Sequence, residues 1–139
     1  MQRRIMPDVI GKQHLLEFSA ATTVREAARA MRDRQVGAAL ITRDGVLEGI
    51  FTERDILHRI VADGRDPDTT RLRDVMTKNP DTIEPDEFAV EALRRMTTRG
   101  YRHLPVVDNG RLVGIVSRRD FLGEEMAVLD DEIGHMQRF

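Results

Sequence analysis

The segment Gly49-Ile50-Phe51-Thr52-Glu53-Arg54-Asp55 returns 65 residues further along the chain as Gly114-Ile115-Val116-Ser117-Arg118-Arg119-Asp120. The match extends outward without a gap, because residues 24–57 align with residues 89–122 and 12 of these 34 pairs are identical. Ordinary composition would give about two identities by chance. Upstream of this block the spacing becomes 66. The chain to about residue 122 therefore consists of two copies of one unit.

The composition limits the classes of protein to which the chain can belong. Its 139 residues, 40% hydrophobic and 33% charged, are typical of a soluble globular protein. The 22 basic residues nearly cancel the 24 acidic ones, whereas a nucleic-acid-binding protein usually has a basic excess. The absence of cysteine excludes disulfides and a cysteine nucleophile. No apolar run is long enough to span a membrane or form a signal peptide, so we expect a cytoplasmic protein with no membrane or nucleic-acid partner.

Each copy begins with the pattern of an amphipathic helix. Thr22 and Thr23 offer an N-cap before an apolar face that starts at Val24. In the second copy Asp86 and Glu87 precede the corresponding face, and we expect them in the first helical turn, where the helix dipole favours acidic residues. Gly100 is expected to end this second helix.

Two strands joined by a tight turn are predicted after each helix. They cover residues 36–42 and 46–51 in the first copy, and 101–107 and 112–116 in the second. A helical stripe follows over residues 56–61, and short extended segments at residues 15–18 and 81–83 lead into each unit. We therefore divide the chain into residues 1–70, the second unit at 71–122, and a C-terminal amphipathic helix at 123–139.

The C-terminal segment carries apolar residues at alternating spacings of four and three. This is the seam of a helix pair, made by Leu122, Met126, Leu129, Ile133 and Met136. Two heptads are too short to persist alone in water, so the helix packs either on its own domain or across a dimer. We also expect Ile56, Ile60 and Phe121 to need cover from a second copy, which favours a homodimer.

The repeated motif places a hydroxyl residue where a strand ends and a helix begins, with Asp three positions later. For a single copy, a capping box is the simpler interpretation. A helix N-terminus also offers free N–H groups to a phosphate, and an Asp one turn further can accept both hydroxyls of a ribose. Two copies in register favour a ligand site. The four histidines, His14, His58, His103 and His135, form no helix-spaced pair, so we predict no metal site.

The doubled unit resembles a tandem pair of CBS domains, the module named after cystathionine beta-synthase. The resemblance rests on the Ser/Thr-x-x-Asp element, on Asp74-Val75-Met76-Thr77, and on the strand Arg102-His103-Leu104-Pro105-Val106-Val107-Asp108. It implies an α+β fold of two pseudo-symmetric β-α-β-β-α units packed sheet to sheet, as in small stand-alone CBS-pair proteins. It also implies dimers and adenosyl ligands, such as AMP, ADP, ATP, NAD(H) or S-adenosylmethionine, none of them obligatory.

The resemblance also assigns roles to individual residues. Asp55 and Asp120 match the ribose-binding Asp, and Thr52 and Ser117 match the hydroxyl beside the phosphates. The segments that enclose the base correspond to Thr82 with Ile83 and to Tyr101 through Pro105, largely through backbone groups. Basic side chains near phosphates correspond to Arg102 and His103.

The two copies diverge around these positions. Gly37 and Ala38 stand where the second copy has Arg102 and His103, and Leu40 stands where the family commonly has Pro. In the helix turn, Glu53 and Arg54 correspond to Arg118 and Arg119. We therefore expect the Asp120 site to be the more electropositive and the preferred one.

These features predict a regulatory protein that binds an adenine nucleotide, senses energy or redox state, and catalyses no reaction. It would act as a homodimer on an unidentified protein partner. The alternative is an interaction protein that uses the CBS scaffold to modulate a partner without binding a physiological nucleotide.

Overall fold

The computed structural model describes residues 2–137, with side chains described up to residue 134. The chain forms two compact units, His14–Pro80 on the one hand and Met1–Gln13 with Asp81–Phe139 on the other. Each has its own hydrophobic core. These units do not coincide with the division expected from the sequence, because residues 1–13 pack on the second repeat and residues 71–80 on the first. The buried Ile5 and Ile10 belong to the core of the second repeat.

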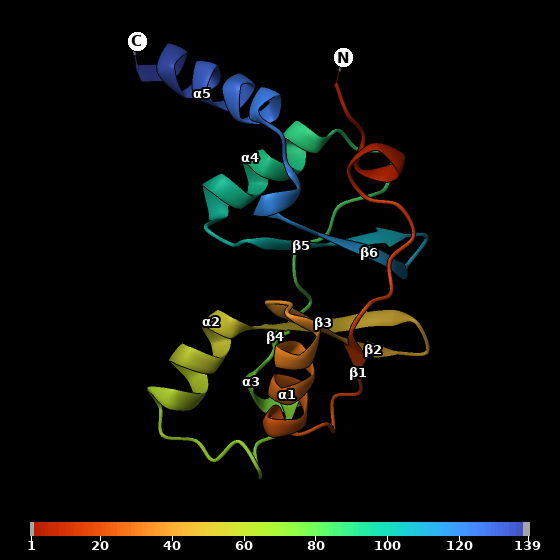
Figure 1. The fold of residues 1–139 in the computed structure, drawn as a ribbon, viewed down its shortest axis with the longest axis vertical. Coiled ribbons are helices and arrows are strands. Elements are labelled where there is room, and N and C mark those ends of the chain that lie inside the picture. Colours follow the sequence, from red (N-terminus) through yellow and green to blue (C-terminus); the bar gives the residue numbers. More distant parts are fainter. Residues whose placement is uncertain (1, 138–139) are drawn as a thin grey trace. The chain divides into compact units, whose positions relative to one another are not determined.

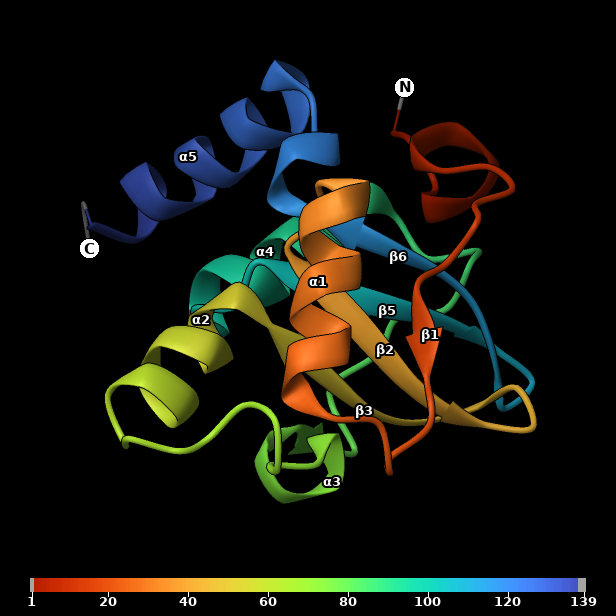
Figure 2. The same cartoon turned by 60° about the horizontal axis from the view of Figure 1, so that its bottom comes forward.

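The unit of residues 14–80 contains a four-stranded sheet with strand order β1-β2-β3-β4. Only the β1–β2 pair is parallel. Figure 2 shows α1 lying across β2 and β3, where its buried face (Val24, Ala27 and Met31) meets Ile41 and Phe51 in one core. The elements are β1 (Glu17–Phe18), α1 (Val24–Arg34), β2 (Ala38–Arg43), β3 (Val46–Thr52), α2 (Glu53–Asp55), its π-helical continuation η2 (Ile56–Val61), α3 (Leu72–Val75) and β4 (Thr77–Lys78).

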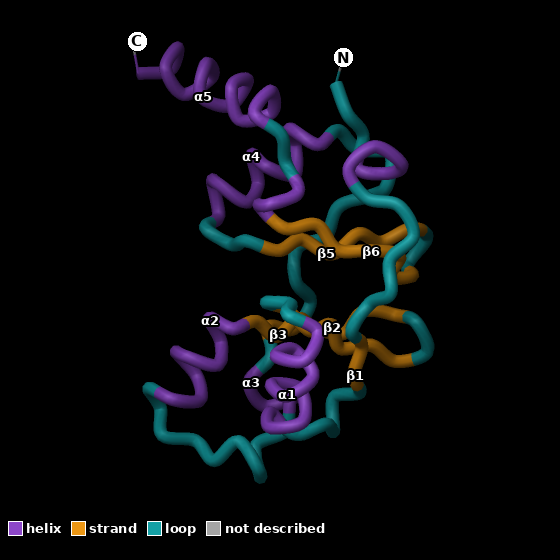
Figure 3. The backbone as a smooth tube through the Cα atoms, viewed as in Figure 1, coloured by secondary structure: helices purple, strands orange, loops and turns teal. Residues whose placement is uncertain are grey.

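The second unit, formed by residues 1–13 and 81–139, is built around the antiparallel pair β5–β6 with α4 and α5 (Figures 1 and 3). Its elements are η1 (Ile5–Val9), α4 (Ala89–Arg99), β5 (His103–Asp108), β6 (Arg111–Ser117), the 3-10 turn η3 (Arg118–Asp120) and α5 (Gly123–Gln137). Helices and strands thus combine in both units, which confirms the α+β fold.

Local signals placed most helix and turn boundaries correctly. The Thr23 hydroxyl accepts a hydrogen bond from the Glu26 amide at 3.2 Å, as expected of an N-cap. Gly100 ends α4 with a left-handed conformation, φ 78°. Asn109 and Gly110 have φ 50° and 80°, which is the left-handed pair that a two-residue hairpin turn needs.

The beginning of α4 differs from the expectation. Phe88 is the N-cap and the helix begins at Ala89, so Asp86 and Glu87 precede the helix instead of lying in its first turn. Glu87 has another role, because its Oε2 accepts a hydrogen bond from the Glu84 amide at 2.7 Å.

Each repeat has an extended segment before its helix, and a proline shortens the pairing of this segment in the second repeat. In the first repeat the Leu40 amide donates to the Leu16 carbonyl at 2.9 Å. The residue equivalent to Leu40 is Pro105, which has no N–H to donate. The ladder is reduced there to a single parallel bridge between Ile83 and Val106.

The segment that precedes each repeat binds the edge of the last strand of the other repeat, which is β3 in one unit and β6 in the other. In one unit β4 pairs with β3 at Gly49 and Ile50. In the other unit the Gln13 side chain takes the place of that strand. Its Nε2 donates to the Ile115 carbonyl at 3.1 Å, and its Oε1 accepts from the Ile115 amide at 2.9 Å. A side-chain amide therefore replaces a peptide group.

The helix α5 leaves most of the predicted apolar seam exposed. Leu129 is buried, whereas Leu122, Met126 and Ile133 are exposed. Met136 lies outside the residues whose side chains are described, as does His135. Besides Leu129, which joins the core, two polar contacts that the sequence did not predict hold the helix, made by Glu125 and Glu132. No described helix is both long and apolar enough to cross a membrane.

Candidate functional site

Both copies of the repeated motif form a capping box. In the second repeat, Oδ2 of Asp120 accepts hydrogen bonds from the Ser117 amide at 2.7 Å and from the Ser117 hydroxyl at 3.3 Å. In the first repeat, Oδ2 of Asp55 accepts from the Thr52 amide at 2.9 Å and from the Thr52 hydroxyl at 3.2 Å. One oxygen of each carboxylate is thus used to fix the turn.

The two carboxylates differ in their other contacts. Oδ1 of Asp55 lies 3.6 Å from Nε of Arg59, one helical turn further on. Asp120 forms no ion pair with any residue of the described part of the chain. Oδ1 of the half-buried Asp120 therefore has no ion-pair partner among the described residues, whereas Asp55 shares its second oxygen with an arginine.

The helix that was expected after Ser117 is short. It consists of the three residues of η3 and ends at Phe121, which is extended with φ −93° and ψ 146°. The backbone resumes helical conformation only at Gly123. In the first repeat α2 continues directly into η2. A helix long enough to have an appreciable dipole therefore follows Thr52 but not Ser117. Binding of an anion near Ser117 would depend on basic side chains instead.

Basic side chains are indeed gathered at the second copy of the motif. The Arg118 amide donates to the Arg102 carbonyl at 3.1 Å, which brings the motif turn beside the start of β5. Arg102, Arg118 and Arg119 are exposed, and none of them pairs with a carboxylate of the described residues.

The first repeat has the same backbone arrangement with other side chains. Its Glu53 amide donates to the Gly37 carbonyl at 3.0 Å. The charges of Glu53 and Arg54 cancel, whereas the second repeat carries three arginines, so the local difference is about three positive charges.

The segments predicted to enclose a base lie side by side in the second unit. The Ile83 amide donates to the Pro105 carbonyl, and the Val107 amide donates to the Ile83 carbonyl, both at 2.9 Å. Across the next strand pair, His103 is in register with Ser117. One sheet therefore brings together Thr82 and Ile83, the beginning of β5, and the Ser117–Asp120 turn.

Comparison with known proteins identifies the family of the repeated unit. The sequence matches the CBS domain family twice, over residues 8–62 and 72–127. The chain belongs to the CBS domain family. Its two matched segments correspond to the two repeats, so the protein contains a CBS pair.

Relatives of the CBS pair differ widely in length. The CBS domain-containing protein CBSCBSPB2 of Arabidopsis thaliana is 41% identical over 102 residues, which are 73% of this chain and 19% of that protein. The chain thus spans about a fifth of the Arabidopsis relative. YhcV of Bacillus subtilis is 37% identical over 105 residues, covering 76% of this chain and 74% of YhcV. The solved structure of PAE2072 from Pyrobaculum aerophilum, complexed with AMP, has 29% identity and a TM-score of 0.80, covering 92% of this chain and 97% of that one.

Sequence reasoning missed Asp81 and Arg95, two polar side chains of the CBS pair that border the predicted base segment, Thr82 with Ile83. The Tyr101 hydroxyl donates to Oδ2 of Asp81 at 3.0 Å, and Arg99 donates to the same oxygen at 2.7 Å. Burial and the hydrogen bond to Asp81 raise the pKa of Tyr101. Arg95 donates to the Thr82 carbonyl at 2.8 Å. The difference between the repeats is the signal that could have pointed to them, because Leu16 and Ala30 stand at the positions equivalent to Asp81 and Arg95.

Proposed function

We propose that this CBS pair is a regulatory protein that binds an adenine nucleotide and catalyses no reaction. The ligand is AMP or another adenosyl nucleotide (ADP, ATP or NAD(H)), and its binding reports the energy or redox state of the cytoplasm to a protein partner. Two features of the Asp120 turn carry the proposal. One oxygen of the Asp120 carboxylate has no ion-pair partner among the described residues, and the three arginines beside it pair with no carboxylate of those residues.

The proposal assigns one part of the ligand to each part of the second unit. Asp120 accepts hydrogen bonds from the ribose hydroxyls, since a carboxylate oxygen can accept from two donors. The arginines at positions 102, 118 and 119, with the Ser117 hydroxyl and His103, attract the phosphates. Thr82, Ile83, Tyr101 and Pro105 enclose the base. The AMP complex of the related protein PAE2072 supports this choice of ligand class.

We assign the weaker site to the first repeat. Thr52, Arg54 and Asp55 repeat the motif, but Arg59 already engages Asp55 and Glu53 opposes an anion. Nucleotides with several phosphates should therefore occupy the Asp120 site first.

A homodimer is part of the proposal, with a corrected choice of residues. Ile60 and Phe121 are buried within their own units and Ile56 is half-buried, so they do not need cover from a second copy. Leu57 and Val61 are instead exposed by 57% and 67%, and Leu122 by 50%. These exposed apolar side chains, two on η2 and one just before α5, support an interface with a second copy.

A thermal-shift panel tests the function. A ligand at about 100 times its dissociation constant adds roughly 2.7 kcal/mol to the free energy of unfolding. We expect stabilisation by at least one of AMP, ADP, ATP and NAD(H), with guanosine nucleotides of equal charge as the matched control. Equal stabilisation by guanosine and adenosine nucleotides would indicate an unspecific anion effect. No stabilisation by any of them would favour the interaction protein that binds no nucleotide.

A further inference from the structure

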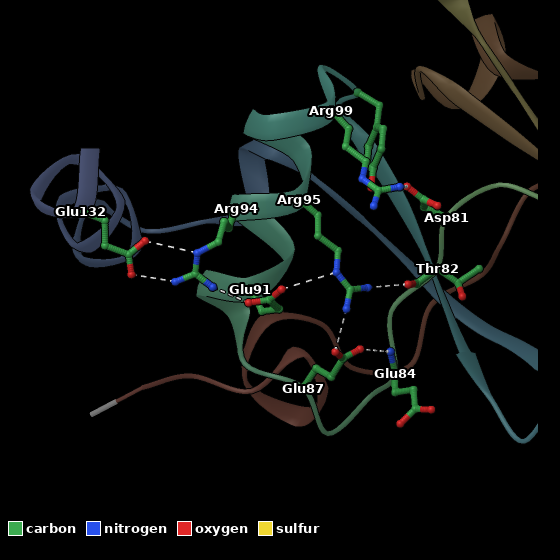
Figure 4. Close-up of polar contacts among 10 residues, drawn as sticks. Asp81, Thr82, Glu84, Glu87, Glu91, Arg94, Arg95, Arg99 and Glu132 are labelled. Carbon is green, nitrogen blue, oxygen red and sulfur yellow. Dashed lines mark hydrogen bonds and ion pairs between the residues drawn. The ribbon is translucent and has the colours of Figure 1, made fainter. Parts of the chain in front are cut away.

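The guanidinium group of one α4 residue holds the base segment of the second repeat. Nη1 of Arg95, on α4, donates to the Thr82 carbonyl at 2.8 Å, and Nη2 donates to Oε1 of Glu87 at 3.1 Å (Figure 4). The other oxygen of Glu87 accepts from the Glu84 amide at 2.7 Å. Arg95 thus fixes residue 82 directly and residue 84 through one carboxylate.

The backbone alone does not hold this segment as firmly as its counterpart. In the first repeat, the Leu40 amide anchors the lead-in strand at Leu16. Pro105 cannot make the equivalent bond to residue 81. The position equivalent to Arg95 is Ala30, whose methyl side chain has no donor. The arginine therefore appears in the repeat in which the proline has removed a backbone hydrogen bond.

We propose that Arg95 is a positioning residue that determines the base specificity of the nucleotide site. This inference rests on the proposed function, because it concerns the segment assigned to the base. Backbone N–H and C=O groups distinguish bases only when they are held in a fixed orientation, since a mobile segment adapts to either donors or acceptors. The backbone groups of Ile83 are held by Pro105 and Val107, and Arg95 supplies the fixed orientation for Thr82 before it without itself touching the ligand.

The same helix provides a matched control. Arg94 pairs with Glu91 and binds Glu132 of α5 at 2.7 Å, but it contacts no residue of the base segment among its described partners (Figure 4). The side chains of Arg94 and Arg95 are similarly exposed, at 38% and 33%, and both pair with Glu91. Arg94→Met and Arg95→Met therefore remove the same charge from neighbouring positions, but only the second releases the Thr82 carbonyl.

The test compares AMP with inosine monophosphate, which differs from AMP only in the base, where a carbonyl replaces the 6-amino group. Calorimetric titrations would use the wild type, Arg95→Met and Arg94→Met. We expect Arg95→Met to bind AMP roughly five- to twentyfold more weakly, because binding must then order the released segment. The AMP-to-inosine-monophosphate affinity ratio should also shrink. Arg94→Met should stay within about twofold of the wild type in both quantities.

A second variant guards against a folding defect. Arg95→Lys keeps the charge but cannot donate to Thr82 and Glu87 with the geometry of a guanidinium fork. It should bind AMP with intermediate affinity and reduced discrimination.

The outcomes separate this inference from the proposed function. If the wild type binds neither nucleotide, the proposed function fails and the inference falls with it. If the wild type prefers AMP and both Arg95 variants keep that preference, the inference alone is overturned. Equal losses in the Arg94 and Arg95 variants with an unchanged ratio would also overturn it, because they would indicate a general effect of charge.

Discussion

Replacing the first glycine of each motif should destabilise the two repeats unequally. A Cβ atom at Gly49 would lie 2.6 Å from Sδ of Met76 and 2.9 Å from the backbone oxygen of Thr77. At Gly114 it would lie 2.6 Å from Cδ1 of Ile10 and 3.0 Å from Oε1 of Gln13. The end of the Ile10 side chain can move aside, and Gln13, although it is bonded to Ile115, is a side chain that can shift by a few tenths of an ångström. The Thr77 carbonyl belongs to β4 and is held by its pairing with β3.

The expected magnitudes follow from these contacts. Overpacking against a fixed neighbour costs about 1–3 kcal/mol, and the upper part of that range applies to Gly49→Ala. Replacing Gly by Ala returns roughly 0.4–1 kcal/mol because the unfolded chain loses freedom. We expect a net loss of about 2 kcal/mol for Gly49→Ala and about 0.5 kcal/mol for Gly114→Ala.

Urea unfolding followed by circular dichroism measures both losses. Gly11→Ala is the control, because a Cβ atom there would meet nothing within 4 Å, and it should change the free energy of unfolding by less than about 0.5 kcal/mol. Equal losses for the two motif glycines, or a larger loss for Gly114→Ala, would refute the reasoning that the rigid backbone contact decides the cost.

Three further predictions concern the C-terminal helix, salt and assembly. Burial opposes the charge of Glu125, but hydrogen bonds from Arg3 and the Leu122 amide hold the pKa of this carboxyl below its ordinary value of 4.5. The carboxylate therefore contributes stability above pH 4.5 that is lost as the pH falls through the lowered pKa, and Glu125→Gln should flatten this acid loss in unfolding titrations. A steeper loss in the variant would contradict the ion pair. Added salt should weaken ATP binding more than adenosine binding, because three arginines meet the phosphates, and calorimetry showing equal weakening would exclude that role. Light scattering should give about twice the chain mass of 15.9 kDa. A monomer mass would rule out the dimer, and a dimer that survives truncation after Gly123 would make α5 dispensable for assembly.

The internal repeat made much of the fold predictable. It located both motifs, and each local signal concerned residues close together in the sequence, such as the Thr23 cap and the Asn109-Gly110 turn. The capping boxes were predictable for the same reason, since the hydroxyl residue and the aspartate are only three positions apart.

Long-range contacts were not predictable in the same way. The packing of residues 1–13 on the second repeat depends on contacts between residues far apart in the sequence, such as that of Gln13 with Ile115. The early end of the turn after Asp120 was also missed, because Phe121 and Leu122 fit the helical stripe equally well by their apolar character. The sequence around Arg95 is that of an ordinary charged position on a helix face, and its contact with Thr82 depends on how α4 packs.

Calorimetric titration of AMP into Asp120→Ala and Asp55→Ala tests the central claim most directly. Both substitutions remove the carboxylate from a capping box, so they should cost the fold a similar amount, about 1 kcal/mol each. The account predicts that Asp120→Ala loses roughly tenfold or more in AMP affinity, because the ribose hydroxyls lose a charged acceptor, whereas Asp55→Ala stays close to the wild type. Unchanged affinity in Asp120→Ala, or a larger loss in Asp55→Ala, would contradict it.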